Sequence, residues 1–113
     1  SKVLQYNSAK SNISNRLVPI GIQDPQVLAG LKVYPNPYTG LTEVTYVLKE
    51  DAEVLLEVLN VLGEKVQTMA KERQRIGKYQ YGFSAKQLGY PSGVYILKLV
   101  VNDRVYTKQL VEL

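Results

Sequence analysis

Apolar and polar side chains alternate in short runs from residue 31 to the end of the chain. Three apolar triplets have this spacing: Val44, Tyr46 and Leu48; Val54, Leu56 and Val58; and Tyr79, Tyr81 and Phe83. Residues at every second position share one face of an extended strand, whereas a helix would spread them around its axis. The pattern therefore predicts an all-β chain whose strands each bury one face.

Turn residues divide this alternation into about seven strands. The predicted strands are 31–35, 42–48, 53–60, 64–72, 78–83, 94–101 and 104–113. Gly63 and the pair Asn102-Asp103 tolerate the left-handed backbone that tight turns require. Strands at this spacing, with no helix between them, are typical of an antiparallel β-sandwich. The last strand is expected at the margin of a sheet, with free backbone groups.

The alternating apolar positions should fill the space between the two sheets. The predicted core residues are Val44, Tyr46, Leu48, Val54, Leu56, Val58, Val66, Tyr79, Phe83, Tyr95, Leu97, Leu99 and Leu110. Each of these side chains contributes about 1.5 to 3 kcal/mol when it is fully buried. Backbone ordering costs about 1 to 2 kcal/mol for each residue, so loss of any one strand should unfold the domain.

The first thirty residues differ from the rest, because Asn and Ser crowd residues 7–15 and no strand or helix period is present. This composition predicts a flexible polar linker over 1–30, followed by a folded domain over 31–113. The chain does not begin with Met and shows no signal peptide. We therefore expect it to be the C-terminal part of a longer protein.

The composition argues against catalysis, because the chain has no cysteine and no histidine. These residues supply the usual general base, the commonest metal ligands and most nucleophile pairs. Glu50, Asp51 and Glu53 are close in sequence, but an exposed turn would not separate their pKa values into acid and base roles. We predict no catalytic residues, no metal, no cofactor and no small-molecule substrate.

Charge gives no reason to expect nucleic-acid binding. The net charge of +4 comes from interspersed basic and acidic residues. The basic cluster from Lys71 to Lys78 is interrupted by Glu72, and no glycine-rich phosphate loop accompanies it. We interpret this cluster as a solvated hairpin tip.

Five motifs in order resemble the type A C-terminal sorting domains of cargo proteins of the type IX (Por) secretion system. They are Val33-Tyr34-Pro35-Asn36-Pro37, Val54 to Asn60 with Gly63 and Val66, Gly77, Ser92-Gly93-Val94-Tyr95, and Lys108-Gln109-Leu110 near the chain end. The likeness covers residues 31–113. One departure is Phe83-Ser84, where the family pattern has an aromatic residue followed by Asp.

The resemblance implies a seven-stranded immunoglobulin-like antiparallel β-sandwich that acts as a secretion signal. It implies partners: the type IX translocon, with its outer-membrane shuttle and sortase components, and a cargo domain N-terminal to the linker. The protein would pass through the periplasm and then reach the cell surface or be secreted. A sortase-like peptidase would remove the domain by cutting between residues 8 and 23, and the cargo could be joined to lipopolysaccharide or released.

On this basis we predict which residues the translocon recognises. They are Pro35, Asn36, Pro37, Gly63, Gly93, Tyr95, Lys108, Gln109, Leu110, Val111, Glu112 and Leu113. Two alternatives stay open: a carbohydrate-binding or spacer immunoglobulin-like module of a secreted hydrolase, and a structural subunit such as a flagellar hook-cap domain. In the first alternative, Tyr38, Tyr90 or Tyr106 would stack on sugar rings.

Overall fold

The structure is a computed structural model that describes residues 27–113. Its elements are β2 (Leu28–Tyr34), β3 (Thr42–Leu48), β4 (Ala52–Asn60), β5 (Lys65–Gln74), β6 (Gly77–Phe83), the 3-10 turn η2 (Lys86–Leu88), β7 (Gly93–Val101) and β8 (Arg104–Glu112). Apart from this single turn, every regular element in the described part is a strand.

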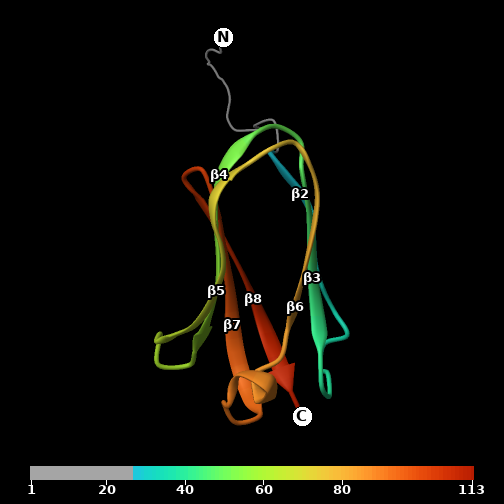
Figure 1. The fold of residues 1–113 in the computed structure, drawn as a ribbon, viewed down its shortest axis with the longest axis vertical. Helices are drawn as coiled ribbons and strands as arrows, with labels where there is room; N and C mark the ends of the chain where they lie inside the picture. The colour runs from blue at the N-terminus through green and yellow to red at the C-terminus, as the bar shows by residue number, and fades with distance from the viewer. Residues whose placement is uncertain (1–26) are drawn as a thin grey trace, which may run out of the picture.

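The strands form two antiparallel sheets that face each other (Figure 1). One sheet has three strands in the order β2-β3-β6, and the other has four in the order β5-β4-β7-β8. The predicted all-β, seven-stranded, immunoglobulin-like sandwich is therefore confirmed. The predicted hairpin tip around Lys71 to Lys78 is wrong, because β5 continues to Gln74 and the chain then crosses to β6 in the opposite sheet.

The first strand starts earlier than the alternation predicted, at Leu28 rather than at residue 31. Its pairing with β3 shifts by one residue between Ala29 and Lys32, where Gly30 has a φ of 63°. Such a bulge places one extra residue in β2, so a strict two-residue period does not continue through it. Because this bulge interrupts the alternation, the sequence pattern did not show where the strand begins.

The core lies between the sheets and contains most of the predicted residues. Val66 and Tyr79 are only partly buried and pack against the core from its margin. Val66 lies where the register of β5 shifts against β4, and Tyr79 lies on the edge strand β6. The Tyr79 ring stacks on Tyr46 with 5.4 Å between centroids, so it covers the core without being enclosed.

Several buried residues were not predicted, and all of them except Val101 lie outside the alternating runs or are polar. The unpredicted buried residues are Leu28, Tyr38, Thr42, Ala52, Glu57, Ala70, Gln74, Ser84, Ala85, Val101 and Glu112. Among them, Tyr38 and Glu112 are 2% exposed and come from opposite ends of the described chain. Their meeting defines the site described next.

Candidate functional site

The C-terminal strand β8 lies at the edge of the four-stranded sheet. Its pairing with β7 runs without interruption from Val101 with Arg104 to Gly93 with Glu112. In an antiparallel pair, successive residues direct their backbone groups alternately toward the partner strand and away from it. The outward-directed backbone groups of β8 therefore belong to the odd-numbered residues from 105 to 111.

Asn36 closes part of this edge with its side chain. Its Nδ2 donates a hydrogen bond to the Gln109 carbonyl oxygen at 2.6 Å, and its Oδ1 accepts one from the Val111 N–H at 3.0 Å. An amide side chain carries the same donor and acceptor as a peptide group. Asn36 thus occupies the place of one residue in an additional strand.

The backbone of Tyr38 extends the same closure to the end of the chain. Its N–H donates to the Val111 carbonyl at 2.9 Å, and its carbonyl accepts the Leu113 N–H at 2.8 Å. These two bonds form an isolated parallel bridge between Tyr38 and Glu112. The edge of β8 is therefore covered from Gln109 to Leu113.

The loop that covers the edge, residues 35–38, is itself held in place. The Thr42 hydroxyl, which is buried, donates to the Pro35 carbonyl at 2.6 Å. The peptide bonds before both prolines are cis. Tyr34, just before the loop, belongs to the sequence motif and is 78% exposed.

Glu112 anchors β8 from inside the sandwich. Its Oε1 accepts the Ala85 N–H at 2.9 Å, and its Oε2 accepts the Lys86 N–H at 3.1 Å. The buried Tyr38 hydroxyl lies beside this carboxylate but has no partner at good hydrogen-bonding geometry. This carboxylate therefore ties the last strand to the start of η2.

Burial of the Glu112 carboxylate on its own would raise its pKa. The neighbouring Tyr38 hydroxyl, the two backbone N–H groups and the Lys86 charge outweigh this effect, so the pKa lies below its ordinary value. Burial, and then the proximity of Glu112, raise the pKa of Tyr38 well above its usual range. Glu112 is thus held as a carboxylate, and Tyr38 as a neutral phenol.

The structure brings most of the predicted recognition residues to one end of the sandwich. Pro35 to Pro37 lie against Gln109 to Leu113, and on β7 Gly93 and Tyr95 pair with Glu112 and Leu110. Gly63 lies in the β4–β5 turn, which is at the same lower end in Figure 1. The Gly63 N–H bonds within its own turn, to the Asn60 carbonyl at 3.0 Å.

Three of the predicted recognition side chains are not available to a partner. Tyr95, Leu110 and Glu112 are at most 4% exposed, so they build the fold around the site. Tyr38 is also buried, which removes it as a sugar-stacking residue. The groups that face solvent here are the loop, the outward face of β8 and the open part of its edge.

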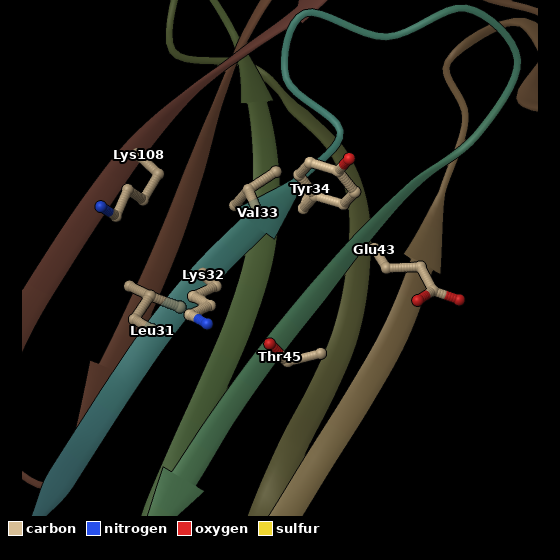
Figure 2. Close-up of a pocket in the computed structure, with 7 residues that line it drawn as sticks. All are labelled: Leu31, Lys32, Val33, Tyr34, Glu43, Thr45 and Lys108. Atoms are coloured by element: carbon tan, nitrogen blue, oxygen red, sulfur yellow. The ribbon is translucent and has the colours of Figure 1, made fainter.

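An open groove with a volume of about 660 Å³ runs along the edge strand β2, lined by residues of β2 and β3 and, from β8, by Lys108. Figure 2 shows Lys108 on β8 across a gap from β2, with Leu31 extending from β2 toward it. Lys108 faces inward by strand alternation but stays exposed because no strand of the described residues 27–113 closes the flank between β2 and β8. The groove places a cation beside the uncovered part of the β8 edge.

We expect hydrogen exchange to detect the hydrogen bonds that the Asn36 side chain makes with β8. In the Asn36→Ala variant, the Val111 N–H loses its acceptor and should exchange about three- to tenfold faster, because such a bond contributes about 0.5 to 1.5 kcal/mol. The Leu113 N–H, bonded to the Tyr38 carbonyl, should change less and serves as the internal control. An unchanged exchange rate of the Val111 N–H would contradict this role of Asn36.

The described residues carry no feature of a metal centre or a membrane helix. No group of three or more acidic side chains in 27–113 could hold a metal ion. Within the same range, no helix is long and apolar enough to cross a membrane. Glu53, one of the carboxylates considered above, lies on β4 and pairs with Arg73 at 3.4 Å.

The solved structure of the Ig1 domain of mouse SynCAM 2 resembles the chain with a TM-score of 0.37 and 16% sequence identity. The match covers 74% of this chain and 97% of that domain. No curated protein matches the sequence.

A family model, described as the secretion system C-terminal sorting domain, matches residues 32–112. The matched range begins within β2 and ends with the last residue of β8, so it contains both parts of the site. Domains of this family are type IX sorting signals rather than enzymes, and they imply export to the cell surface or secretion. The chain belongs to the family of secretion system C-terminal sorting domains.

Proposed function

We propose that this domain directs an N-terminal cargo across the outer membrane through the type IX translocon, and that it is read at the end where residues 35–38 meet β8. The observation that supports this proposal is the set of hydrogen bonds between residues 35–38 and β8. Through Asn36 and Tyr38, these bonds join the two motifs nearest the boundaries of the matched range. A partner at this end would contact both motifs together. It would therefore distinguish a folded signal from an unfolded one.

Recognition uses the uncovered part of the β8 edge. Val105 and Thr107 direct their backbone N–H and carbonyl groups outward, beyond the stretch that the loop closes. An exposed strand edge of this kind can accept an additional strand from a partner. The nearby Lys108 and the groove beside β2 offer a charge and an apolar surface for that partner's side chains.

Processing follows export in this proposal. The domain folds in the periplasm, passes through the translocon with shuttle components, and is then cut off by a sortase-like peptidase. The cut falls within the linker at residues 1–30, between residues 8 and 23, which lie outside the described residues. The folded signal begins near Leu28, so a cut there leaves its strands intact.

A reporter fusion tests the sorting role. A periplasmic reporter joined upstream of residues 1–113 should reach the cell surface in a type IX host, and it should stay in the periplasm of the same host without its translocon. Surface protease accessibility and the mass of the processed reporter are the readouts. Retention of the fusion in the periplasm of the competent host would end the proposal.

Thr107 separates edge recognition from folding in the same assay. Thr107→Pro removes one outward N–H and blocks strand addition, while proline is tolerated on an edge strand. We expect at least about tenfold less surface reporter, the equivalent of about 1.4 kcal/mol, with an unfolding midpoint close to that of the parent. Thr107→Val keeps the N–H and should export normally. Normal export of the proline variant would show that the translocon does not recognise the β8 edge, but it would not contradict the sorting role.

A further inference from the structure

The outward faces of the two sheets differ in the number of large aliphatic side chains that they carry. Neighbouring residues on a strand point to opposite faces, so the pairing registers identify the outward side chains. On the three-stranded sheet they are Ala29, Lys32, Tyr34, Glu43, Thr45, Val47, Lys78, Gln80 and Gly82. Such a mainly polar face is what a solvated antiparallel sheet shows.

The four-stranded sheet carries aliphatic side chains among polar ones on its outward face, where Glu53, Thr107 and Gln109 also lie. Its outward aliphatic residues are Leu55, Leu59, Val94, Ile96, Val100, Val105 and Val111. They lie on β4, β7 and β8, and Val94 and Val105 are 37% and 58% exposed. In the described part of the chain, no layer packs over this face, because the other sheet lies on the inner side. These aliphatic side chains form two groups on either side of the row Glu57, Lys98 and Thr107, and exposed apolar groups of this kind favour an interaction surface.

Charges on this face have an ordered arrangement. Glu57 lies at its centre and is 6% exposed, with Lys65 Nζ at 3.6 Å and Lys98 Nζ at 3.7 Å from its carboxylate oxygens. The other outward cations, Lys71 and Arg73, lie on the edge strand β5. The outward residues of β8, from Val105 to Val111, carry no charge.

This arrangement is complementary to itself about one particular axis. A twofold axis parallel to the strands, between β4 and β7, lays β4 of one copy over β7 of the other. Each β4 residue then faces the residue with which it pairs in its own sheet, so Glu57 faces Lys98 of the second copy. By the same operation Leu55 faces Val100, and Leu59 faces Ile96.

The two edge strands of the sheet also favour this axis. The axis places the basic strand β5 of one copy over the uncharged outward side of β8 of the other copy, where lysine stems can cover valine side chains. An axis perpendicular to the strands would instead set β5 over itself and bring Lys65 toward Lys71 of the other copy. Like charges in contact oppose association, so the first axis is favoured.

We infer that the outward face of the β5-β4-β7-β8 sheet binds a second copy of this domain, face to face, with Glu57 and Lys98 forming reciprocal ion pairs between the copies. Four strands about 4.8 Å apart and about 30 Å long cover on the order of 600 Å² per copy. A total of about 1,200 Å² lies at the lower limit for specific interfaces. The dimer should therefore be weak and form at micromolar or higher concentrations.

Sedimentation of the full chain tests the dimer directly and does not depend on export. The parent protein should convert from monomer to dimer between micromolar and millimolar concentrations. Ile96→Lys buries an extra charge opposite Leu59 of the second copy and should weaken association at least about tenfold. Val47→Lys makes the same type of change on the outward face of the other sheet and should leave association unchanged.

A charge exchange tests the register. Lys98→Glu and Glu57→Lys each set like charges against each other in a homodimer, so each variant alone should be monomeric. Their mixture restores two opposite-charge contacts and should form a dimer, provided that both variants show a cooperative unfolding transition. A parent that stays monomeric at millimolar concentration overturns the inference. Equal effects of Ile96→Lys and Val47→Lys, or a mixture of folded variants that stays monomeric, also overturn it.

Discussion

Deletion of residues 110–113 is expected to abolish both cooperative folding and export of a fused reporter. The deletion removes Leu110, which is fully buried, and Glu112, which anchors β8 to η2. It also removes the backbone groups that bond to Tyr38. A buried leucine contributes about 2 to 5 kcal/mol, and bonds to a buried carboxylate about 1.5 to 3 kcal/mol each. Together these losses match the whole stability of a typical small domain.

Urea unfolding followed by circular dichroism, together with the reporter assay, checks this expectation. Deletion of Leu113 alone is the matched control, because its side chain is 65% exposed and its N–H makes a single bond to Tyr38. That shorter deletion should lower stability by about 1 kcal/mol and keep export. Export of the chain lacking 110–113 at the parental level would refute both the closing role of β8 and its place in recognition.

Alternation was sufficient to predict the strands because the two-residue period follows directly from extended backbone geometry. It located β3, β4, β6 and β7 to within about two residues. Two of its failures have a common cause. At Gly30 in β2 and around Val66 in β5, a bulge shifts the register, so the sequence period no longer reports which face a side chain occupies.

The site was predicted only in part, because its contacts join residues far apart in sequence. Pro35 to Pro37 and the chain end were selected from a family pattern, which gives no geometry. Asn36 bonds to Gln109 and Val111 from a loop that has no apolar period, so the sequence pattern could not predict these bonds. Tyr38, an aromatic residue directly after Pro37, was a sequence signal for a buried contact in this loop. Its burial, however, depends on β8, which is far away in the sequence.

The family departure at Phe83-Ser84 has a local explanation. The Ser84 hydroxyl oxygen, one residue before the N-cap of the η2 turn at Ala85, accepts the Gln87 N–H at 3.2 Å. Asp and Ser are both suited to this role, because each offers a side-chain oxygen to a backbone N–H that lacks a partner. The substitution therefore keeps the turn that presents Ala85 and Lys86 to Glu112.

Replacement of Glu112 is expected to be the most destabilising single change at the site. Glu112→Ala leaves the buried Ala85 N–H and the Lys86 N–H without an acceptor, which should cost about 3 kcal/mol. In a domain of this size, that corresponds to a decrease in melting temperature of about 12 to 24 °C. Glu112→Gln keeps the shape but turns an amide donor toward one N–H, so about 2 kcal/mol should be lost.

The effect of Glu112 should also depend on pH in a defined direction. Its pKa in the folded protein lies below the ordinary value of 4.5. The folded state therefore favours the carboxylate, and the stability it contributes is fully present above that ordinary value. This stability is lost as the pH falls through the lowered pKa, because protonation then removes the charge that the N–H groups bind. The Gln variant has no such proton to gain.

Urea unfolding of the parent and of Glu112→Gln at neutral and acidic pH measures this contribution. The difference in unfolding free energy between the two proteins should be largest near neutral pH and should shrink as the pH falls below 4.5. Glu50→Gln, an exposed carboxylate in the β3–β4 turn, should stay within about 0.5 kcal/mol of the parent at every pH. A difference for Glu112→Gln that is constant with pH would mean that its charge does not hold β8 in place.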